Sequence, residues 1–298
     1  LILRQGSASM RRVEEITQAT DGLKFDGKVA AQTVDDFQFS DFTFKYTSSE
    51  TINLDNIELA LPKGKTLGIV GKTGSGKTTL IRQLLNQFPS GTGVFNMGER
   101  AYSDYQDPSV RRLIGYVPQD HVLFSRSVRD NIAFGKGDAS DQDILRSIRL
   151  ASFEEDLENM ERGLDTMIGE KGVSISGGQK QRISIARALI KDPEILILDD
   201  SLSAVDAKTE QNIISNIQNV RQGKTTIIST HRLSAVKGAD EIVVLDNGKI
   251  VERGTHDVLI KEKGWYYDQF MKQEIKEAAD TTSEGSQRYY RSERGEHI

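Results

Sequence analysis

Residues 71–78 read Gly-Lys-Thr-Gly-Ser-Gly-Lys-Thr, and this stretch decides the fold. It matches the phosphate-loop pattern of glycine, four residues, glycine, lysine and a hydroxyl residue. Small residues let backbone N–H groups turn toward phosphate oxygens; here they are Gly71, Thr73, Gly74, Ser75 and Gly76. Lys77 adds a positive charge, and the Thr78 hydroxyl can ligate Mg²⁺. The pattern predicts a site for a nucleoside triphosphate.

The residues on either side of the loop fit the same interpretation. Residues 66–70 form a short apolar run typical of a buried strand. From Thr79 to Leu85 the apolar residues recur at helical spacing, and Thr79 joins the predicted phosphate-binding set. A flexible glycine loop is the alternative, but such a loop does not account for the strand predicted before it and the helix predicted after it.

Composition limits the class of protein. The chain has 298 residues, of which 37% are hydrophobic and 28% charged, so it has room for one large domain or two small ones. A formal net charge of -5 gives no broad electrostatic footprint for nucleic acid, and we expect no nucleic-acid partner. The absence of cysteine excludes disulfides and thiolate metal sites and suits a reducing compartment such as the cytoplasm.

The first residues suggest a longer polypeptide. No run approaches the roughly 18 consecutive apolar residues that a membrane-spanning helix needs, and we expect this piece alone to be soluble. The chain begins with Leu1 rather than Met and lacks a signal peptide's apolar stretch, so we expect that it was cut from a longer chain. A processed terminus is the alternative.

Periodicity predicts an α/β core with an appended β layer. Residues 1–34 contain a plausible helix, which we interpret as a connector. Apolar residues then alternate in Phe37, Phe39, Phe42 and Phe44, with a slip at Asp41, which predicts strands. Further buried strands are predicted at residues 195–198, 225–229 and 241–245, the last continuing through Asp246-Asn247-Gly248 into a hairpin.

Two regions lack strand signals. Between Gln119 and Gln179 helical spacing predominates, which predicts a small helical subdomain. Residues 271–298 form a charged tail with few aliphatic residues, and we expect it to be mobile.

A second apolar run ends in carboxylates. Residues 195–198 read Ile-Leu-Ile-Leu and are followed by Asp199 and Asp200. Ligands of α/β sheets bind at the carboxyl edge of the strands, so Asp199 is placed to hold Mg²⁺. Such a run is common in any α/β sheet, but its pairing with the phosphate loop favours a functional role.

A second anion site is predicted at Ser176-Gly177-Gly178-Gln179. Helical spacing follows these residues, so they would lie at a helix N-terminus, where free N–H groups and the helix dipole favour an anion. Without the other motifs, a simple helix start explains the segment equally well.

At this point the sequence resembles the nucleotide-binding domain of an ATP-binding cassette (ABC) transporter, over roughly Phe37 to Phe270. The resemblance implies a P-loop (RecA-like) parallel-sheet core with an N-terminal antiparallel β layer and an inserted α-helical subdomain. It implies a cassette domain over residues 35–270, with the helical subdomain at about 120–180. It also implies ATP and Mg²⁺ as ligands.

The resemblance assigns roles to further residues. Tyr46 resembles the aromatic residue that stacks on adenine, Gln119 the glutamine of a switching loop, and His231 the switch histidine. The metal set is then Thr78, Gln119 and Asp199, and the catalytic set Asp200, His231 and Gln119. Ser176 to Gln179 resembles the family signature, and Ser203 to Asp206 the dimer-contact loop. Taken singly, Tyr46, Gln119 and His231 also fit structural roles.

Two segments resemble exporters in particular. Residues 166–172 are similar to the loop that precedes the signature in exporters, and residues 5–13 to the cytoplasmic end of their last membrane helix. This implies a transmembrane domain outside the present chain and a position on the cytoplasmic face of the inner membrane. An isolated cassette subunit and a soluble cassette acting on nucleic acid or the ribosome are the alternatives.

One residue departs from the pattern of active members. Asp200 stands where the family usually has glutamate, so the carboxylate that polarises the attacking water is one methylene short. We therefore expect a site that binds ATP well and hydrolyses it slowly. Because cassettes of this family pair head to tail, the chain resembles the degenerate half of a heterodimeric multidrug exporter. A homodimer with two slow sites is the alternative.

Overall fold

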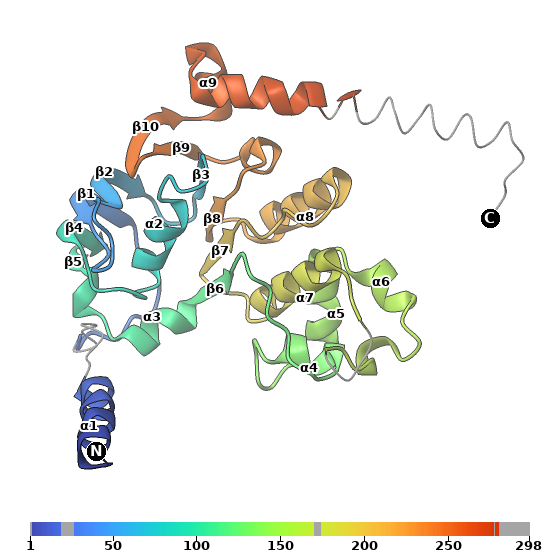
Figure 1. The fold of residues 1–298 in the computed structure, drawn as a ribbon. Coiled ribbons are helices and arrows are strands. Elements are labelled where there is room, and N and C mark those ends of the chain that lie inside the picture. Colours follow the sequence, from blue (N-terminus) through green and yellow to red (C-terminus); the bar gives the residue numbers. More distant parts are fainter. Residues whose placement is uncertain (1, 19–26, 170–173, 277, 280–298) are drawn as a thin grey trace, which may run out of the picture.

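A six-stranded sheet carries the phosphate loop at the centre of the fold (Figure 1). The computed structural model describes residues 2–18, 27–169, 174–276 and 278–279. The strand order in the sheet is β10-β9-β3-β8-β7-β6. Strand β3 runs parallel to β8 and β9, β7 runs parallel to β6 and β8, and β10 is antiparallel to β9. The strands are β3 (Thr66–Gly71), β6 (Ile114–Val117), β7 (Ile195–Asp199), β8 (Thr225–Ser229), β9 (Glu241–Asp246) and β10 (Lys249–Gly254).

A four-stranded antiparallel sheet in the order β2-β1-β4-β5 covers one side of this core. Its strands are β1 (Phe37–Phe44), β2 (Leu54–Leu61), β4 (Thr92–Met97) and β5 (Arg100–Ala101). The slip in the alternation of β1 is a bulge, since Asp41 has a φ of 48° and the register shifts between Phe39 and Phe42. An extra residue there turns both phenylalanines into the core. The predicted fold class is confirmed.

The parallel sheet is buried on both faces. In β7, Ile195 and Ile197 pack into the core shared with the antiparallel sheet, whereas Leu196 and Leu198 pack into the core on the opposite face. Helices α2 (Lys77–Leu84) and α3 (Asp107–Leu113) contribute to the first core. Burial on both faces explains why the strand is an uninterrupted apolar run rather than an alternating one.

Helices cover the opposite face (Figure 1). Between β6 and α7 the described residues contribute no strand to either sheet. They form helices α4 (Val128–Ala133), α5 (Asp141–Leu150), α6 (Glu154–Glu158) and the 3₁₀ turn η2 (Gly163–Asp165). Helices α7 (Gly177–Leu189) and α8 (Ala207–Val220) follow, and α9 (His256–Glu262) lies after the β9–β10 hairpin. Of the predicted exporter-type loop at residues 166–172, residues 170–172 lie outside the described residues.

The hairpin turn has the predicted chemistry. Asn247 and Gly248 have φ angles of 47° and 78°, and Lys249 pairs with Asp246. Two consecutive residues with positive φ match the twist of the flanking strands, and the Asn-Gly pair suits that conformation.

The two ends of the chain are described in part. Helix α1 (Ile2–Gln18) leaves the apolar side chains of Met10, Val13 and Ile16 exposed. Of the predicted tail, residues 271–276 and 278–279 are helical, while 277 and 280–298 lie outside the described residues. Within the described ranges, we find no helix with the length and apolar character required to cross a membrane.

The central sheet should depend on the packing of β7. Ile197 is 1% exposed, so Ile197→Ala should lower the free energy of unfolding by about 2–5 kcal/mol, because it removes buried methyl groups and leaves a cavity. Val251→Ala on β10 is the control, since this side chain is 52% exposed, and it should cost less than about 1 kcal/mol. Urea denaturation followed by circular dichroism measures both. Equal losses for the two variants would contradict the packing described here.

Candidate nucleotide-binding site

The predicted site residues follow strand ends at one edge of the parallel sheet. Asp199 at the end of β7 pairs with Ser229 at the end of β8, and Ser229 in turn pairs with Ile69 of β3. On the other side of β7, Leu198 pairs with Val117 at the end of β6. The carboxyl ends of four parallel strands therefore bring the phosphate loop, the two aspartates, the segment of Gln119 and the segment of His231 to one edge.

The phosphate loop takes a conformation that depends on glycine. Gly71, Gly74 and Gly76 have φ angles of 146°, 81° and 107°. A Cβ on Gly71 would lie 2.1 Å from the carbonyl oxygen of Leu245 and 2.8 Å from the Ser75 Oγ. The loop is tied to the hairpin because the Gly248 N–H donates to the Ser75 carbonyl at 2.9 Å. The exposed residues Thr73 and Gly74 form the outer part of the turn.

Helix α2 begins directly after this turn. Gly76 is its N-cap, and no side chain caps the helix. The first N–H groups of a helix have no acceptor within the helix, so the amides at Lys77, Thr78 and Thr79 can point at an anion.

Lys77 folds back into the loop. Its side chain is buried, and its Nζ donates to the carbonyl oxygens of Gly71 at 2.9 Å and Lys72 at 3.0 Å. Burial lowers the pKa of Lys77, while the charges of Asp200 and Asp199 act in the opposite direction. A phosphate lying in the loop would meet this ammonium group at short range.

Thr78 and Asp199 provide neighbouring oxygen atoms. The Thr78 Oγ1 donates to Asp199 Oδ1 at 3.2 Å, and Asp199 is 1% exposed. Burial raises the pKa of Asp199, so a nearby cation would favour its ionised form. A hydroxyl and a carboxylate are oxygen ligands of the kind that Mg²⁺ takes, usually one or two protein groups together with phosphate oxygens and water.

Gln119, the third predicted metal ligand, makes no hydrogen bond to that pair among the described residues. It is exposed two residues beyond the end of β6, and within the described ranges its side chain makes no hydrogen bond. Tyr116 of β6 instead approaches the site, with its hydroxyl 3.5 Å from Asp199 Oδ2. Burial raises the pKa of Tyr116 to about 12, so the phenol stays protonated and can donate. The sequence analysis did not single out this tyrosine.

Tyr46 is brought to the start of α2. Its hydroxyl donates to Thr79 Oγ1 at 3.2 Å, and its ring packs edge-on against Phe44 and Phe88 at centroid distances of 4.8 Å. The side chain is half-buried. A ring fixed on one edge beside the phosphate loop fits both an adenine platform and an aromatic residue at the edge of the core.

Asp200 and His231 lie beside this group. Asp200 has a φ of 48°, and its N–H donates to the Ser229 carbonyl at 2.8 Å. The Ser203 hydroxyl donates to the Asp200 carbonyl at 3.1 Å, so the main chain is held on both sides. Partial burial lowers the pKa of His231, and the charge of Lys77 acts in the same direction. At pH 7 His231 is therefore neutral and able to accept or donate a hydrogen bond.

The segment Ser176 to Gln179 is not brought to the phosphate loop of its own chain. Ser176 caps α7 by accepting from the Gln179 N–H at 3.2 Å, and Gln179 Oε1 accepts from the Ser176 N–H at 2.8 Å. Among the described residues, no hydrogen bond or ion pair links this segment to residues 71–78. A Cβ on Gly178 would lie 2.9 Å from the Ala204 carbonyl, so the helix start packs closely on the predicted dimer-contact loop.

Arg232 links two of the predicted loops. Its guanidinium donates to the carbonyl oxygens of Val205 at 2.7 Å and Ser203 at 3.1 Å, and it pairs with the buried Glu210 at 3.1 Å. The residue after His231 therefore connects the histidine segment to the dimer-contact loop. Sequence reasoning missed this role, although Arg232 directly follows the histidine that it did single out.

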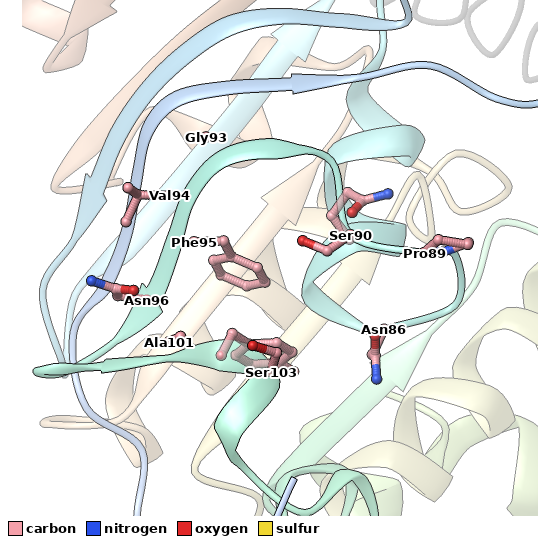
Figure 2. Close-up of a pocket in the computed structure, with 11 residues that line it drawn as sticks. Asn86, Pro89, Ser90, Gly93, Val94, Phe95, Asn96, Ala101 and Ser103 are labelled. Carbon is pink, nitrogen blue, oxygen red and sulfur yellow. The ribbon is translucent and has the colours of Figure 1, made fainter. Parts of the chain in front are cut away.

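A separate pocket lies at the far end of α2 (Figure 2). It has a volume of about 390 Å³ and is formed by residues of α2, β4, the segment between them and the turn after β5, including Asn86, Ser90, Phe95 and Ser103. Its lining contains amides, hydroxyls and aromatic rings but no charged side chain. A triphosphate requires positive charge, so this pocket does not compete with the phosphate loop as the nucleotide site.

Comparisons with known proteins agree with the geometry. Residues 54–203 match the ABC transporter family. The chain is 52% identical to the probable multidrug resistance ABC transporter ATP-binding/permease protein YheI of Bacillus subtilis over 275 residues, which cover 92% of this chain and 47% of that protein. It is 40% identical to the multidrug resistance-like ATP-binding protein MdlA of Escherichia coli over 283 residues, which cover 95% of this chain and 48% of that protein.

A solved structure extends the similarity to three dimensions. A bacterial Atm1-family ABC exporter with ATP bound superposes with a TM-score of 0.84 at 32% identity, over 91% of this chain and 48% of that one. The chain thus spans about half the length of the curated relatives it matches.

Two glycines of the loop should respond differently to the same substitution. Gly71→Ala places a methyl group against the Leu245 carbonyl, whereas at Gly74 nothing lies within 4 Å and only the positive φ is costly. We expect Gly74→Ala to cost about 1–2 kcal/mol of unfolding free energy, and Gly71→Ala clearly more. Chemical denaturation without nucleotide measures both. A smaller cost for Gly71→Ala than for Gly74→Ala would contradict the loop geometry.

Proposed function

The chain belongs to the ABC transporter family as an exporter-type ATP-binding domain, and from this premise we propose that it is the slow motor domain of a multidrug exporter. In this proposal it binds and hydrolyses ATP to drive substrate export through a membrane domain. One observation supports the proposal: Lys77, Thr78 and Asp199 lie at one edge of the sheet. Lys77 is hydrogen-bonded within the loop, and Thr78 is hydrogen-bonded to Asp199 of β7. A triphosphate with a divalent cation fits this arrangement.

The residues of this edge take distinct roles. The amides of residues 73–79 hold phosphate oxygens, and Lys77 contacts the β- and γ-phosphates. Thr78, Asp199 and Gln119 would hold Mg²⁺, which would supply positive charge beside the phosphate oxygens. Tyr46 supports the adenine, and neutral His231 forms a hydrogen bond to the γ-phosphate.

Slow hydrolysis follows from Asp200. Its main chain is held by Ser229 on one side and Ser203 on the other, so the backbone does not readily move to offset the missing methylene. A misplacement of about 1 Å can cost on the order of 100-fold in rate, or about 2.7 kcal/mol of barrier. Nucleotide binding does not require this carboxylate and is retained.

Head-to-tail pairing with a second cassette is the proposed assembly. The segment Ser176 to Gln179 is separate from the phosphate loop of its own chain. It forms the N-terminus of α7, where Ser176 and Gly177 are exposed. Such a surface is suited to close over the nucleotide of another cassette, as the resemblance implies. Because Asp200 weakens one site, we propose a non-identical partner that carries the faster site, and a homodimer with two slow sites is the alternative.

An aromatic patch supports docking to a membrane domain. Val122 and Phe134 are 68% and 67% exposed, and the rings of Phe124 and Phe134 lie 4.8 Å apart. Exposed clusters of large apolar side chains mark protein interfaces. We propose that this patch, on the helical side of the cassette, receives a membrane domain from the part of the transporter that the present chain does not span. The cassette would then lie on the cytoplasmic face of the inner membrane.

The alternative hypothesis is a soluble cassette that acts on nucleic acid or the ribosome. The relatives do not support it, because they are named as transporter or multidrug resistance proteins.

Restoring the longer acid should raise turnover. In the complete transporter, Asp200→Glu should increase ATP hydrolysis at this site by more than about tenfold, because the carboxylate regains the reach needed to polarise water. ATP affinity should change little. Asp257→Glu, an exposed substitution of the same kind on α9, is the control. Phosphate release and nucleotide titration measure rate and affinity. Unchanged hydrolysis in Asp200→Glu at saturating ATP would overturn the proposed impairment.

A further inference from the structure

A helix near the carboxyl end of the chain packs beside the histidine segment. Residues 265–276 are helical and follow α9 directly (Figure 1). Phe270 of this helix belongs to the same buried cluster as Leu233 and Val236 of the 3₁₀ turn η3 (Leu233–Val236). This turn begins two residues after His231. The helix therefore shares a buried core with the turn that follows the proposed catalytic residue His231.

The start of this helix is firmly anchored to the hairpin. The carboxylate of Glu252 on β10 accepts from the Trp265 N–H at 2.5 Å and from the Tyr266 N–H at 3.1 Å. A carboxylate at the N-terminus of a helix satisfies free donors and complements the helix dipole. Tyr266 is fully buried, and its hydroxyl lies 3.0 Å from His256 Nδ1. These contacts fix the position of the helix relative to the sheet.

Two turns further along, Gln273 binds the histidine segment at two points. Its Nε2 donates to the main-chain carbonyl of His231 at 2.8 Å, and its Oε1 accepts from the Leu233 N–H at 2.9 Å. The two contacts lie on either side of Arg232. A planar amide bound at both ends fixes the orientation as well as the position of the three-residue segment.

The other side of the segment is held by Arg232, through Ser203, Val205 and Glu210. Within the described ranges, the side chain of His231 makes no hydrogen bond of its own. The direction of its imidazole therefore depends on where the main chain is held. Among the described residues, Gln273 and Arg232 hold it from outside, and the Thr230 Oγ1 accepts from the Arg232 N–H at 3.0 Å within the segment.

We propose that Gln273 is a positioning residue for His231, through which the helix of residues 265–276 controls how the imidazole meets the γ-phosphate. This inference rests on the proposed function of His231. It assigns a role to a helix for which no hydrogen bond or ion pair to the phosphate loop is found in the described part of the chain. A displacement of the helix, for example on contact with another part of the assembly, would pass directly to the histidine.

The test compares ATP with ADP, because only ATP carries the γ-phosphate. Gln273→Met removes both hydrogen bonds but keeps the length of the side chain and its helix propensity. Lys272→Met, on the exposed surface of the same helix, is the matched control. Affinities for Mg-ATP and Mg-ADP are measured on the full chain in its complex, together with hydrogen exchange at the Leu233 amide. Circular dichroism verifies that both variants fold.

We expect Gln273→Met to lower the preference for ATP over ADP by about fivefold, the effect of losing one or two hydrogen bonds, and to speed exchange at Leu233. Lys272→Met should change neither. Adding Gln273→Met to His231→Ala should bring no further loss of ATP preference, because the glutamine acts through the histidine.

The outcomes separate the two claims. If His231→Ala lowers the preference for ATP but Gln273→Met does not, the role of Gln273 is overturned and that of His231 stands. If His231→Ala has no effect, the proposed function of the histidine fails. Unchanged exchange at Leu233 in Gln273→Met would show that Gln273 does not hold the segment, and would overturn its positioning role independently of the result for His231→Ala.

Discussion

The buried ammonium group of Lys77 is the interaction on which the rest of the site depends. It is held by two carbonyl oxygens of the phosphate loop, and the loop can bend around it only because Gly71, Gly74 and Gly76 adopt positive φ angles. A buried lysine is costly unless its charge is compensated. Asp199 and Asp200 supply part of that compensation from the end of β7. The chain thus keeps a concentrated positive charge where phosphate oxygens can reach it.

The parallel sheet makes this arrangement possible, because strands distant in sequence end side by side. The residues that follow those strand ends are then connected by a few side chains. Arg232 joins the histidine segment to the loop of residues 203–206, and Gln273 joins it to the helix of residues 265–276. A displacement of the loop of residues 203–206 or of the helix of residues 265–276 would therefore displace His231.

Local signals predicted much of this structure. The Asn247-Gly248 turn, the apolar run before Asp199 and the irregular alternation at Asp41 each have a cause within a few residues, and all appear in the fold. Strands β2 and β4 were not predicted individually, and in the structure they pair antiparallel with β1 on its two sides. The contact of Gln273 with His231 joins residues 42 positions apart and depends on how a helix packs. A local sequence pattern cannot predict such a contact.

The most direct measurement is a titration of the protein, in its complex, with Mg-ATP, for the native chain and for Lys77→Ala. Lys261→Ala, which removes an exposed lysine on α9, serves as the control. The account predicts saturable binding by the native chain and the control, and a loss of at least about 100-fold in affinity for Lys77→Ala, because a buried charge-assisted contact to phosphate is removed. Binding that does not saturate, or an affinity that Lys77→Ala leaves unchanged, would contradict the proposed binding of phosphate by Lys77.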